Sequence, residues 1–199
     1  VNWIFYLKSS DQFCNQSILD SLYLQALWLE KNDERHILAN HYFENLKALL
    51  FAGCFFIGKD ADRWRERALI EIPQQLDEQT LQDGGHYERS PQYHALMLEN
   101  YLDIYNLAIN NEALFNDAFL SEVKNYAVCG LDFLNAIVFP DKNIPLFNDS
   151  AFNIAPSLDE LNQYAERLFA YRSPEKSIIP SIINKPNSGF YGFKSATDM

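Results

Sequence analysis

The chain has 199 residues, 48% of them hydrophobic, which is enough to bury a sizeable core and argues against wholesale disorder. Its formal net charge is −11 and its basic residues form no run, so we expect no nucleic-acid partner. Only seven glycines, with leucine, alanine and glutamate common, favour helices over a sheet with many tight turns.

Neither a membrane span nor a metal site is indicated by the sequence. No apolar run is long enough to cross a bilayer, so we expect no transmembrane segment. The three cysteines, Cys14, Cys54 and Cys129, are scattered, and the last two have the apolar surroundings typical of small core residues. No CxxC or CxxH spacing occurs, and we therefore expect no metal and no cofactor.

In chain order, residues 2–8 are typical of the end of a helix, and hydrophobic periodicity predicts helices over residues 17–30 and 33–57. The later half of the helix at 33–57 is apolar nearly all round, so it should be buried on most sides. Gly58 is expected to end it.

The first half of that helix carries a polar sector. At 100° per residue, one half of the helix wall holds His36, Asn40, His41, Glu44, Asn45 and Lys47. His36 and His41 are five residues apart and do not share a face as a zinc-binding pair does. Two interpretations stay open: a polar network that ties neighbouring helices together, or a cleft lined by Asn40 and His41.

A further helix is predicted over residues 60–81, with a bend at Pro73. Three more follow, and their predicted ranges are residues 91–109, 117–138 and 158–170. Long helices joined by short turns are expected to pack as antiparallel helical hairpins. After residue 171 the pattern changes to a linker that leads into a strand near residues 187–193.

The polar segment at residues 83–94 reads DGGHYERSPQYH and joins two of these helices. Ser90 is expected to cap the second helix and Pro91 to be its first residue, which puts Tyr93 in the first turn. The helix dipole there favours a phenolate by only ~0.3–1 kcal/mol. Arg89, His86 and His94 are therefore the local groups that could lower its pKa further. The alternative is a helix-entry turn whose aromatic residues only pack.

Two blocks of sequence carry a resemblance. Residues 38–53 (LANHYFENLKALLFAG) and residues 83–94, in this order and at this separation, resemble the heparinase II/III family of polysaccharide lyases. Residues 145–150 (PLFNDS) resemble a further segment of that family. The resemblance implies an all-α fold, an incomplete (α/α) toroid of antiparallel helical hairpins over residues 1–175. Residues 176–199 are then expected to be the linker and first strand of a C-terminal β-sandwich-like domain of the same protein.

The family cleaves uronic-acid-containing polysaccharides by β-elimination, so the resemblance implies an acidic polysaccharide as substrate. It implies that Tyr93 is the catalytic tyrosine, acting as base, acid or both. It also implies that Asn40, with His41 beside it, donates a hydrogen bond to the substrate carboxylate. Residues expected to bind substrate, or to tune Tyr93, are His86, Glu88, Arg89, His94 and Glu44. For a bacterial member of the family, a periplasmic or cell-envelope location is expected.

Two other functions remain possible from the sequence. A glycoside hydrolase on a similar fold would need two carboxylates, for which Glu44, Glu88 and Asp83 are available. A tyrosine and an asparagine at the matched positions favour elimination over hydrolysis. A catalytically silent carbohydrate-binding protein is the other alternative. A densely sulfated polymer is disfavoured unless arginines gather in space, the candidates being Arg63, Arg65, Arg67 and Arg89.

Overall fold

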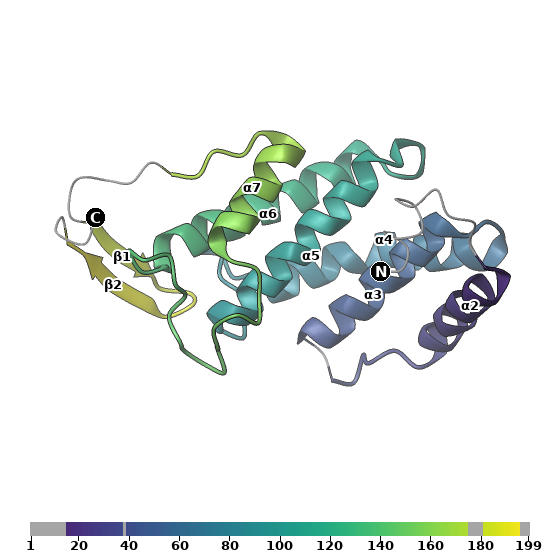
Figure 1. Cartoon of the computed structure of the whole chain (residues 1–199), viewed down its shortest axis with the longest axis horizontal. Helices are drawn as coiled ribbons and strands as arrows, with labels where there is room; N and C mark the ends of the chain where they lie inside the picture. The colour runs from purple at the N-terminus through teal and green to yellow at the C-terminus, as the bar shows by residue number, and fades with distance from the viewer. Residues whose placement is uncertain (1–14, 38, 175–180, 196–199) are drawn as a thin grey trace. The chain divides into compact units, whose positions relative to one another are not determined.

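The computed structural model describes residues 15–37, 39–174 and 181–195 (Figure 1). The predicted helix at residues 2–8 and Cys14 lie outside them. Within the described residues the fold is mostly helical, as predicted, and ends in a β-hairpin. Its elements are α2 (Gln16–Lys31), α3 (Ala39–Phe55), α4 (Lys59–Gln79), α5 (Pro91–Ile109), the 3-10 turn η1 (Glu112–Leu114), α6 (Asp117–Ile137), α7 (Leu158–Phe169), β1 (Ser181–Lys185) and β2 (Phe190–Lys194).

The contacts divide the chain into two compact units. The first comprises Val1–Gln75 and Asn111–Phe115, and the second comprises Leu76–Asn110 and Asn116–Met199. The first unit has an apolar core built from α2, α3 and the beginning of α4, with Ala26, Leu49, Ala52, Ala61 and Trp64 buried together. The rings of Tyr23 and Phe56 pack against Trp64 and extend this core.

The helix predicted from residue 33 begins six residues later, at Ala39. The residues before it are held in a connection by tertiary contacts that outweigh helix propensity. The Glu34 backbone N–H donates to Asn45 Oδ1 at 2.7 Å, and Asn45 Nδ2 donates to the Glu34 carboxylate at 3.1 Å. Asp33 accepts from Arg67 of α4. His36 consequently lies in a turn outside the helix and is not part of its polar face.

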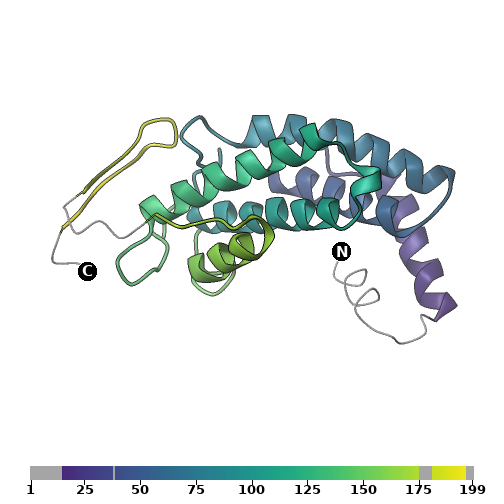
Figure 2. The same cartoon turned by 90° about the horizontal axis from the view of Figure 1, so that it is seen from above.

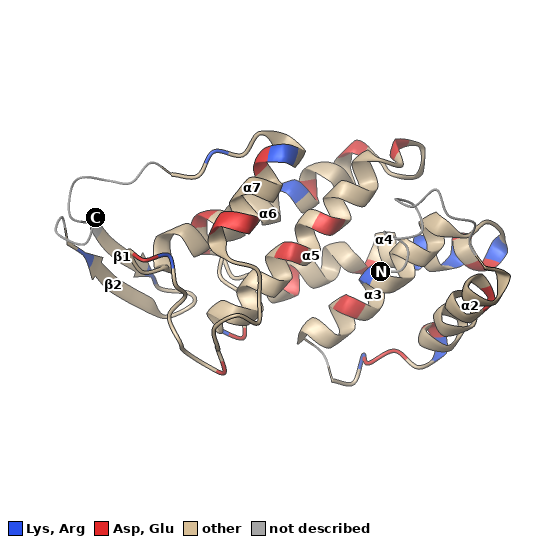
Figure 3. Ribbon diagram, in the orientation of Figure 1, with Lys and Arg blue, Asp and Glu red and all other residues tan. Residues whose placement is uncertain are grey.

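The arginines of α4 are paired with carboxylates of α2, of the connection after it and of α4 itself; Figure 3 marks the basic and acidic residues of the chain. Arg63 contacts Glu30 and Asp60, and Arg65 contacts Asp62. Arg67 contacts Asp33 and Glu71, and Glu71 also accepts from Arg35 and from the Tyr42 hydroxyl. Through these ion pairs the arginines join α4 to α2 and to the connection that follows α2.

The second unit is built from α5, α6 and α7, which lie side by side (Figures 1 and 2). α5 is buried along most of its length, and both of its neighbours pack on it. The short helix α7 begins with a capping box between Ser157 and Glu160. Its Tyr164 hydroxyl donates to Asp103 Oδ1 of α5 at 3.0 Å. Cys129, predicted to be a core residue, is instead exposed on α6.

A β-hairpin occupies the stretch for which a linker and a single strand were predicted. β1 and β2 pair antiparallel, with Ser181 opposite Lys194, and a four-residue turn at residues 186–189 joins them. One face packs on α6, where the rings of Phe190 and Phe133 lie 5.6 Å apart. The other face exposes Ile182, Tyr191 and Phe193. The proposed domain boundary near residue 175, and the closure of the helices into a toroid, stay predictions.

Candidate active site

The segment Asp83-Gly84-Gly85-His86-Tyr87-Glu88-Arg89, here called the motif loop, is folded back on the end of α4. Thr80 and His86 form an isolated antiparallel bridge. The Gly84 backbone N–H donates to the Leu81 carbonyl and the Leu81 N–H to the Gly85 carbonyl, both at 2.8 Å. The Tyr87 N–H donates to the Gln79 carbonyl at 2.9 Å. These bonds give the loop a defined shape before any ligand is bound.

The start of α5 is capped as the sequence predicts. Ser90 is the N-cap, its hydroxyl accepts from the Tyr93 N–H at 3.4 Å, and Pro91 occupies the first helical turn. Tyr93 is half-buried in that turn, which leaves part of its side chain open to solvent. Because its helix start is capped and packed, the backbone that carries the phenol is fixed.

A second serine, from a distant loop, also caps α5. Ser150 Oγ accepts from the Gln92 N–H at 3.1 Å and lies 3.0 Å from Ser90 Oγ. The Ala151 N–H donates to Gln92 Oε1 at 2.8 Å. The structure therefore places residues 145–150, the third segment of the resemblance, against the start of the helix that carries Tyr93. Ser150 was not among the predicted site residues, and that short resemblance was the only signal for it.

His94 is buried, with 4% of its surface exposed, and both ring nitrogens have partners. Nδ1 accepts from the His86 backbone N–H at 3.2 Å, and Nε2 donates to the Gly130 carbonyl of α6 at 2.9 Å. These partners assign a neutral ring protonated at Nε2. Burial lowers the pKa of His94 to about 4. His94 thus holds the motif loop on α6 through these two bonds. Its predicted role in substrate binding stays a prediction.

His86 is also buried, with 3% of its surface exposed. Nε2 lies 3.2 Å from Gln79 Oε1, while Nδ1 lies 3.7 Å from the Glu88 carboxylate. Burial, with a smaller contribution from His94, lowers the pKa of His86 to about 3. This ring, too, is placed to support the loop from inside and does not face a polymer in solvent.

These two histidines predict a pH-dependent stability. Their folded-state pKa values of about 3 and about 4 lie below the ordinary 6.5 of an unfolded histidine. As the pH is lowered below 6.5, these histidines take up protons in the unfolded chain but stay neutral in the folded chain. The free energy of unfolding should therefore decrease as the pH is lowered, by up to about 1.4 kcal/mol per pH unit for each histidine. Urea denaturation between about pH 7 and pH 5 measures this slope. A stability independent of pH over this range would contradict it.

Glu88 and Arg89 lie nearer the surface. Glu88 is half-buried, and Arg89 is exposed in a left-handed backbone conformation, with φ of 57°. Asn148 Nδ2 donates to the Arg89 carbonyl at 2.9 Å, so the loop at residues 145–150 supports this conformation as well. Arg89 is thus a cation held close to the start of α5. Tyr93, Arg89 and Glu88 are the predicted site residues that this unit presents toward solvent.

The remaining predicted site residues lie in the first unit, on the first two turns of α3. Asn40 is half-buried, whereas His41 and Glu44 are exposed. His41 Nδ1 lies 3.4 Å from the Glu34 carboxylate. Two interpretations of the polar sector were open, a network between helices and a cleft. Asn45 fits the network, because it is buried and bonded to Glu34. Asn40 and His41 are instead accessible to solvent. The pairing of Asn40 with Tyr93, which belongs to the second unit, stays a prediction.

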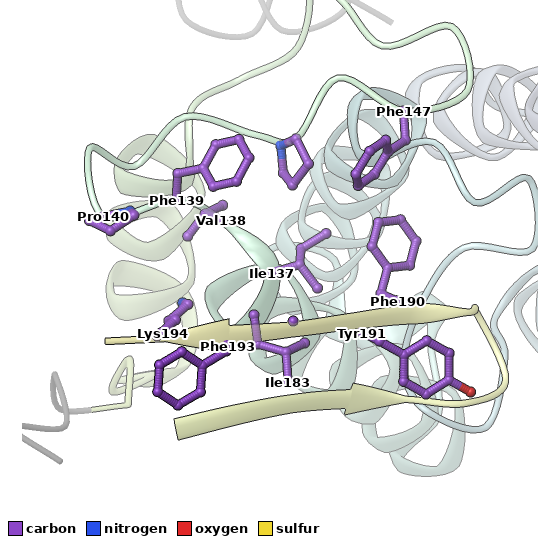
Figure 4. A pocket seen from close by; sticks show the side chains of 12 residues that line it. Ile137, Val138, Phe139, Pro140, Phe147, Ile183, Phe190, Tyr191, Phe193 and Lys194 are labelled. Atoms are coloured by element: carbon purple, nitrogen blue, oxygen red, sulfur yellow. The ribbon is translucent and has the colours of Figure 1, made fainter. Parts of the chain in front are cut away.

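An apolar pocket lies beside the hairpin (Figure 4). It has a volume of about 300 Å³, and its walls are the end of α6, the loop that follows and the hairpin. Apart from Lys194, its lining is apolar or aromatic, and it includes no residue of the motif loop. The Lys194 ammonium donates to the Asn135 carbonyl at 3.2 Å, and burial lowers its pKa. Among the described residues that line the pocket, Lys194 is thus the one charged group in a wall that is otherwise apolar or aromatic.

Neither a metal cluster nor a membrane helix is found within residues 15–37, 39–174 and 181–195. In that part of the chain no group of three or more His, Cys, Asp or Glu side chains could hold a metal ion. Likewise, none of its helices combines the length and the apolar character that crossing a bilayer requires.

The glycine pair of the motif loop is required by close packing. Gly84 has φ of +87°, and a Cβ there would lie 2.5 Å from the Cys129 carbonyl oxygen of α6. Gly84→Ala should therefore cost about 2–4 kcal/mol in the free energy of unfolding, which combines backbone strain with the clash. Urea denaturation measures it.

Gly189 offers a matched control for this substitution. It has a similar φ of +80°, but a Cβ there meets nothing within 4 Å. Gly189→Ala should therefore report the backbone strain alone, about 1–2 kcal/mol. Equal losses for the two variants would show that the contact with α6 does not constrain the loop.

Comparison of sequences gives the family directly. The model of the family described as "Heparinase II/III N-terminus" matches residues 4–175. A heparin-sulfate lyase from Pedobacter heparinus is 29% identical over 195 residues, covering 90% of this chain and 28% of the relative. A heparin-sulfate lyase from Bacteroides stercoris is 28% identical over 116 residues, covering 56% of this chain and 16% of the relative. The chain thus spans less than a third of the length of these curated relatives.

Comparison of structures agrees with the sequences. A crystal structure of heparinase III superposes with a TM-score of 0.64 at 20% identity, over 83% of this chain and 27% of the other. The heparan sulfate lyase HepC from Pedobacter heparinus superposes with a TM-score of 0.53 at 25% identity, over 80% of this chain and 27% of that one. With the helical fold, the capped tyrosine helix and a family match over most of its length, the chain belongs to the heparinase II/III N-terminus family.

Proposed function

We propose that the protein is a polysaccharide lyase that cleaves a uronic-acid-containing polysaccharide by β-elimination. The observation that carries the proposal is the half-buried Tyr93 on the capped first turn of α5, with the exposed Arg89 in the motif loop directly before the Ser90 cap. Both stand in the motif by which this chain resembles its family. The matched relatives from Pedobacter and Bacteroides are named heparin-sulfate lyases, which supports the same reaction class.

The chemistry explains why a phenol and an amide suit this role. The proton at C5 of the uronate lies next to a carboxylate, so its removal adds negative charge to a group that is already anionic. Donors such as the Asn40 amide would bind that carboxylate and stabilise the enolate-like intermediate more than the substrate. Tyr93 would take the C5 proton or protonate the leaving oxygen at C4, or do both in turn. No metal is needed for either transfer.

The charge distribution bears on the substrate. Three of the four arginines that could have formed a sulfate-binding cluster, Arg63, Arg65 and Arg67, are paired with carboxylates in the first unit. Arg89 is exposed beside the motif residues. With a net charge of −11, this favours a polymer recognised through its uronate carboxylates over one recognised through dense sulfation.

The test is a screen of the full-length protein against heparan-type, alginate-like and bacterial exopolysaccharide uronate polymers. Elimination creates an unsaturated uronate that absorbs ultraviolet light, so a rise in absorbance with depolymerisation is the expected result. New reducing ends without absorbance would indicate the glycoside hydrolase alternative. Binding without any product would indicate a silent carbohydrate-binding protein, and either result overturns the proposal.

A further inference from the structure

The turn of the β-hairpin is bonded directly to the first residue of the motif loop. Asp83 Oδ2 accepts from the Ser188 backbone N–H at 2.8 Å and from Ser188 Oγ at 2.9 Å. Asp83 Oδ1 accepts from the Gly85 N–H at 3.2 Å, within the loop itself. Only 3% of Ser188 is exposed. One carboxylate therefore joins two segments that are more than a hundred residues apart in sequence.

The electrostatics of this junction favour an ionised carboxylate. Burial alone would raise the pKa of Asp83, but the donors on Ser188 and Gly85, with a contribution from Lys185, lower it below its ordinary value. Hydrogen bonds to a charged acceptor are stronger than those between neutral groups. Lys185 Nζ also donates to the Asp83 carbonyl at 3.1 Å and lies over the Phe133 ring.

Packing leaves the loop little room between the turn and α6. A Cβ at Gly85 would lie 2.8 Å from the Phe133 ring and 3.0 Å from Ser188 Cβ. Phe190, the residue that starts β2, packs its ring against Phe133 on the other side of the turn. Gly85 of the motif loop is thus packed between α6 and the hairpin turn at residues 186–189.

The junction is connected to Tyr93 by a short chain of bonds. Beyond Gly85, the His86 N–H donates to His94 Nδ1, on the residue next to Tyr93. The Arg89 N–H donates to the His86 carbonyl at 2.9 Å, directly before the Ser90 cap. A displacement of the loop at Asp83 would therefore reach the start of α5 through these hydrogen bonds.

We propose that Ser188 and Asp83 are positioning residues: the hairpin turn orders the motif loop and thereby sets the position of Tyr93. Its catalytic consequence rests on the proposed lyase function, whereas the ordering of the loop does not. The hairpin accordingly supports the site by ordering the motif loop, although it lies outside residues 4–175, which the family model matches.

The test compares Ser188→Ala with Ser121→Ala, the same change at an exposed serine of α6, in the full-length protein. Removing Ser188 Oγ leaves Asp83 with one donor fewer. Amide hydrogen exchange at residues 84–90 should become about fivefold faster in Ser188→Ala. This factor corresponds to the net stabilisation that one hydrogen bond contributes, about 1 kcal/mol. Unchanged exchange at these amides would overturn the proposal.

Turnover separates positioning from mere stabilisation. With a uronate polymer, kcat of Ser188→Ala should fall about tenfold while KM changes less than about twofold, because binding surfaces are kept and the phenol is misplaced. Faster loop exchange with an unchanged kcat would overturn the positioning role. If the unmodified protein cleaves no polymer, the lyase proposal fails, and loop exchange alone then decides the ordering role.

A double-mutant cycle supplies the second line of evidence. Once Asp83→Ala has removed the acceptor, adding Ser188→Ala should change loop exchange by less than about twofold, since the bond is already lost. Additive effects of the two substitutions would show that the two residues act separately and would overturn the proposed junction.

Discussion

Replacing Tyr93 with phenylalanine is expected to remove most of the elimination activity while leaving the fold intact. The substitution removes the one atom that can exchange a proton and keeps the ring that packs in the first turn of α5. Positioned general acid–base groups contribute about 10²–10⁴ in rate, and kcat should fall by that range. Initial rates of ultraviolet absorbance with the full-length protein measure the loss. Retention of the variant on immobilised polymer measures binding, which should change little.

The same helix offers a matched control. Tyr105 is also half-buried on α5, and its ring packs on Phe169 at 5.3 Å. Tyr105→Phe makes the same chemical change far from the helix start, so its kcat should stay within about twofold of the unmodified protein. If Tyr93→Phe turns over substrate at nearly the normal rate, the phenol is not the catalytic group.

Asn40→Ala is expected to lower kcat by about 10²–10³, the range observed when a donor to a developing anion is removed. The effect should fall on kcat more than on KM, because the amide contact strengthens as the uronate carboxylate gains charge. Steady-state kinetics on the preferred polymer give both constants. A raised KM with an unchanged kcat would mean that Asn40 only binds the ground state.

A second asparagine on α3 separates chemistry from stability. Asn45 is buried and bonded to Glu34 through both its oxygen and its nitrogen. Asn45→Ala should therefore cost about 1–3 kcal/mol in the free energy of unfolding. Asn40 is half-buried near the start of the helix, so Asn40→Ala should lower the free energy of unfolding much less. The two variants should thus show opposite patterns of lost activity and lost stability.

The helices could be predicted where the sequence carries local signals. Ser90 and Pro91 mark the start of α5, and the structure begins this helix at Pro91. Pro73 was expected to bend the helix over residues 60–81, and it lies within α4 without ending it. The start of α3 was wrong by six residues because Glu34 bonds to Asn45 across a turn, a contact that no local pattern reports.

The supports of the site could not be predicted for the same reason. Ser150 reaches the start of α5 across about sixty residues, and Ser188 reaches Asp83 across about a hundred. Periodicity and capping rules act over a few residues, so they identify Tyr93 and Ser90 but neither distant serine. The burial of His86 and His94 could not be predicted either. Both lie in a polar motif that suggests contact with a ligand, yet both are buried in the structure.

The capping of α5 by Ser150 has a consequence for how this family can vary. Connecting segments usually accept inserted residues at little cost, and the exposed stretch at residues 139–143 should behave in that way. Residues 148–151 are different, since an added residue there would withdraw the hydroxyl and the backbone amide that hold Gln92. Length variation among homologues should therefore stop abruptly just before Asn148, within what looks like a single surface loop.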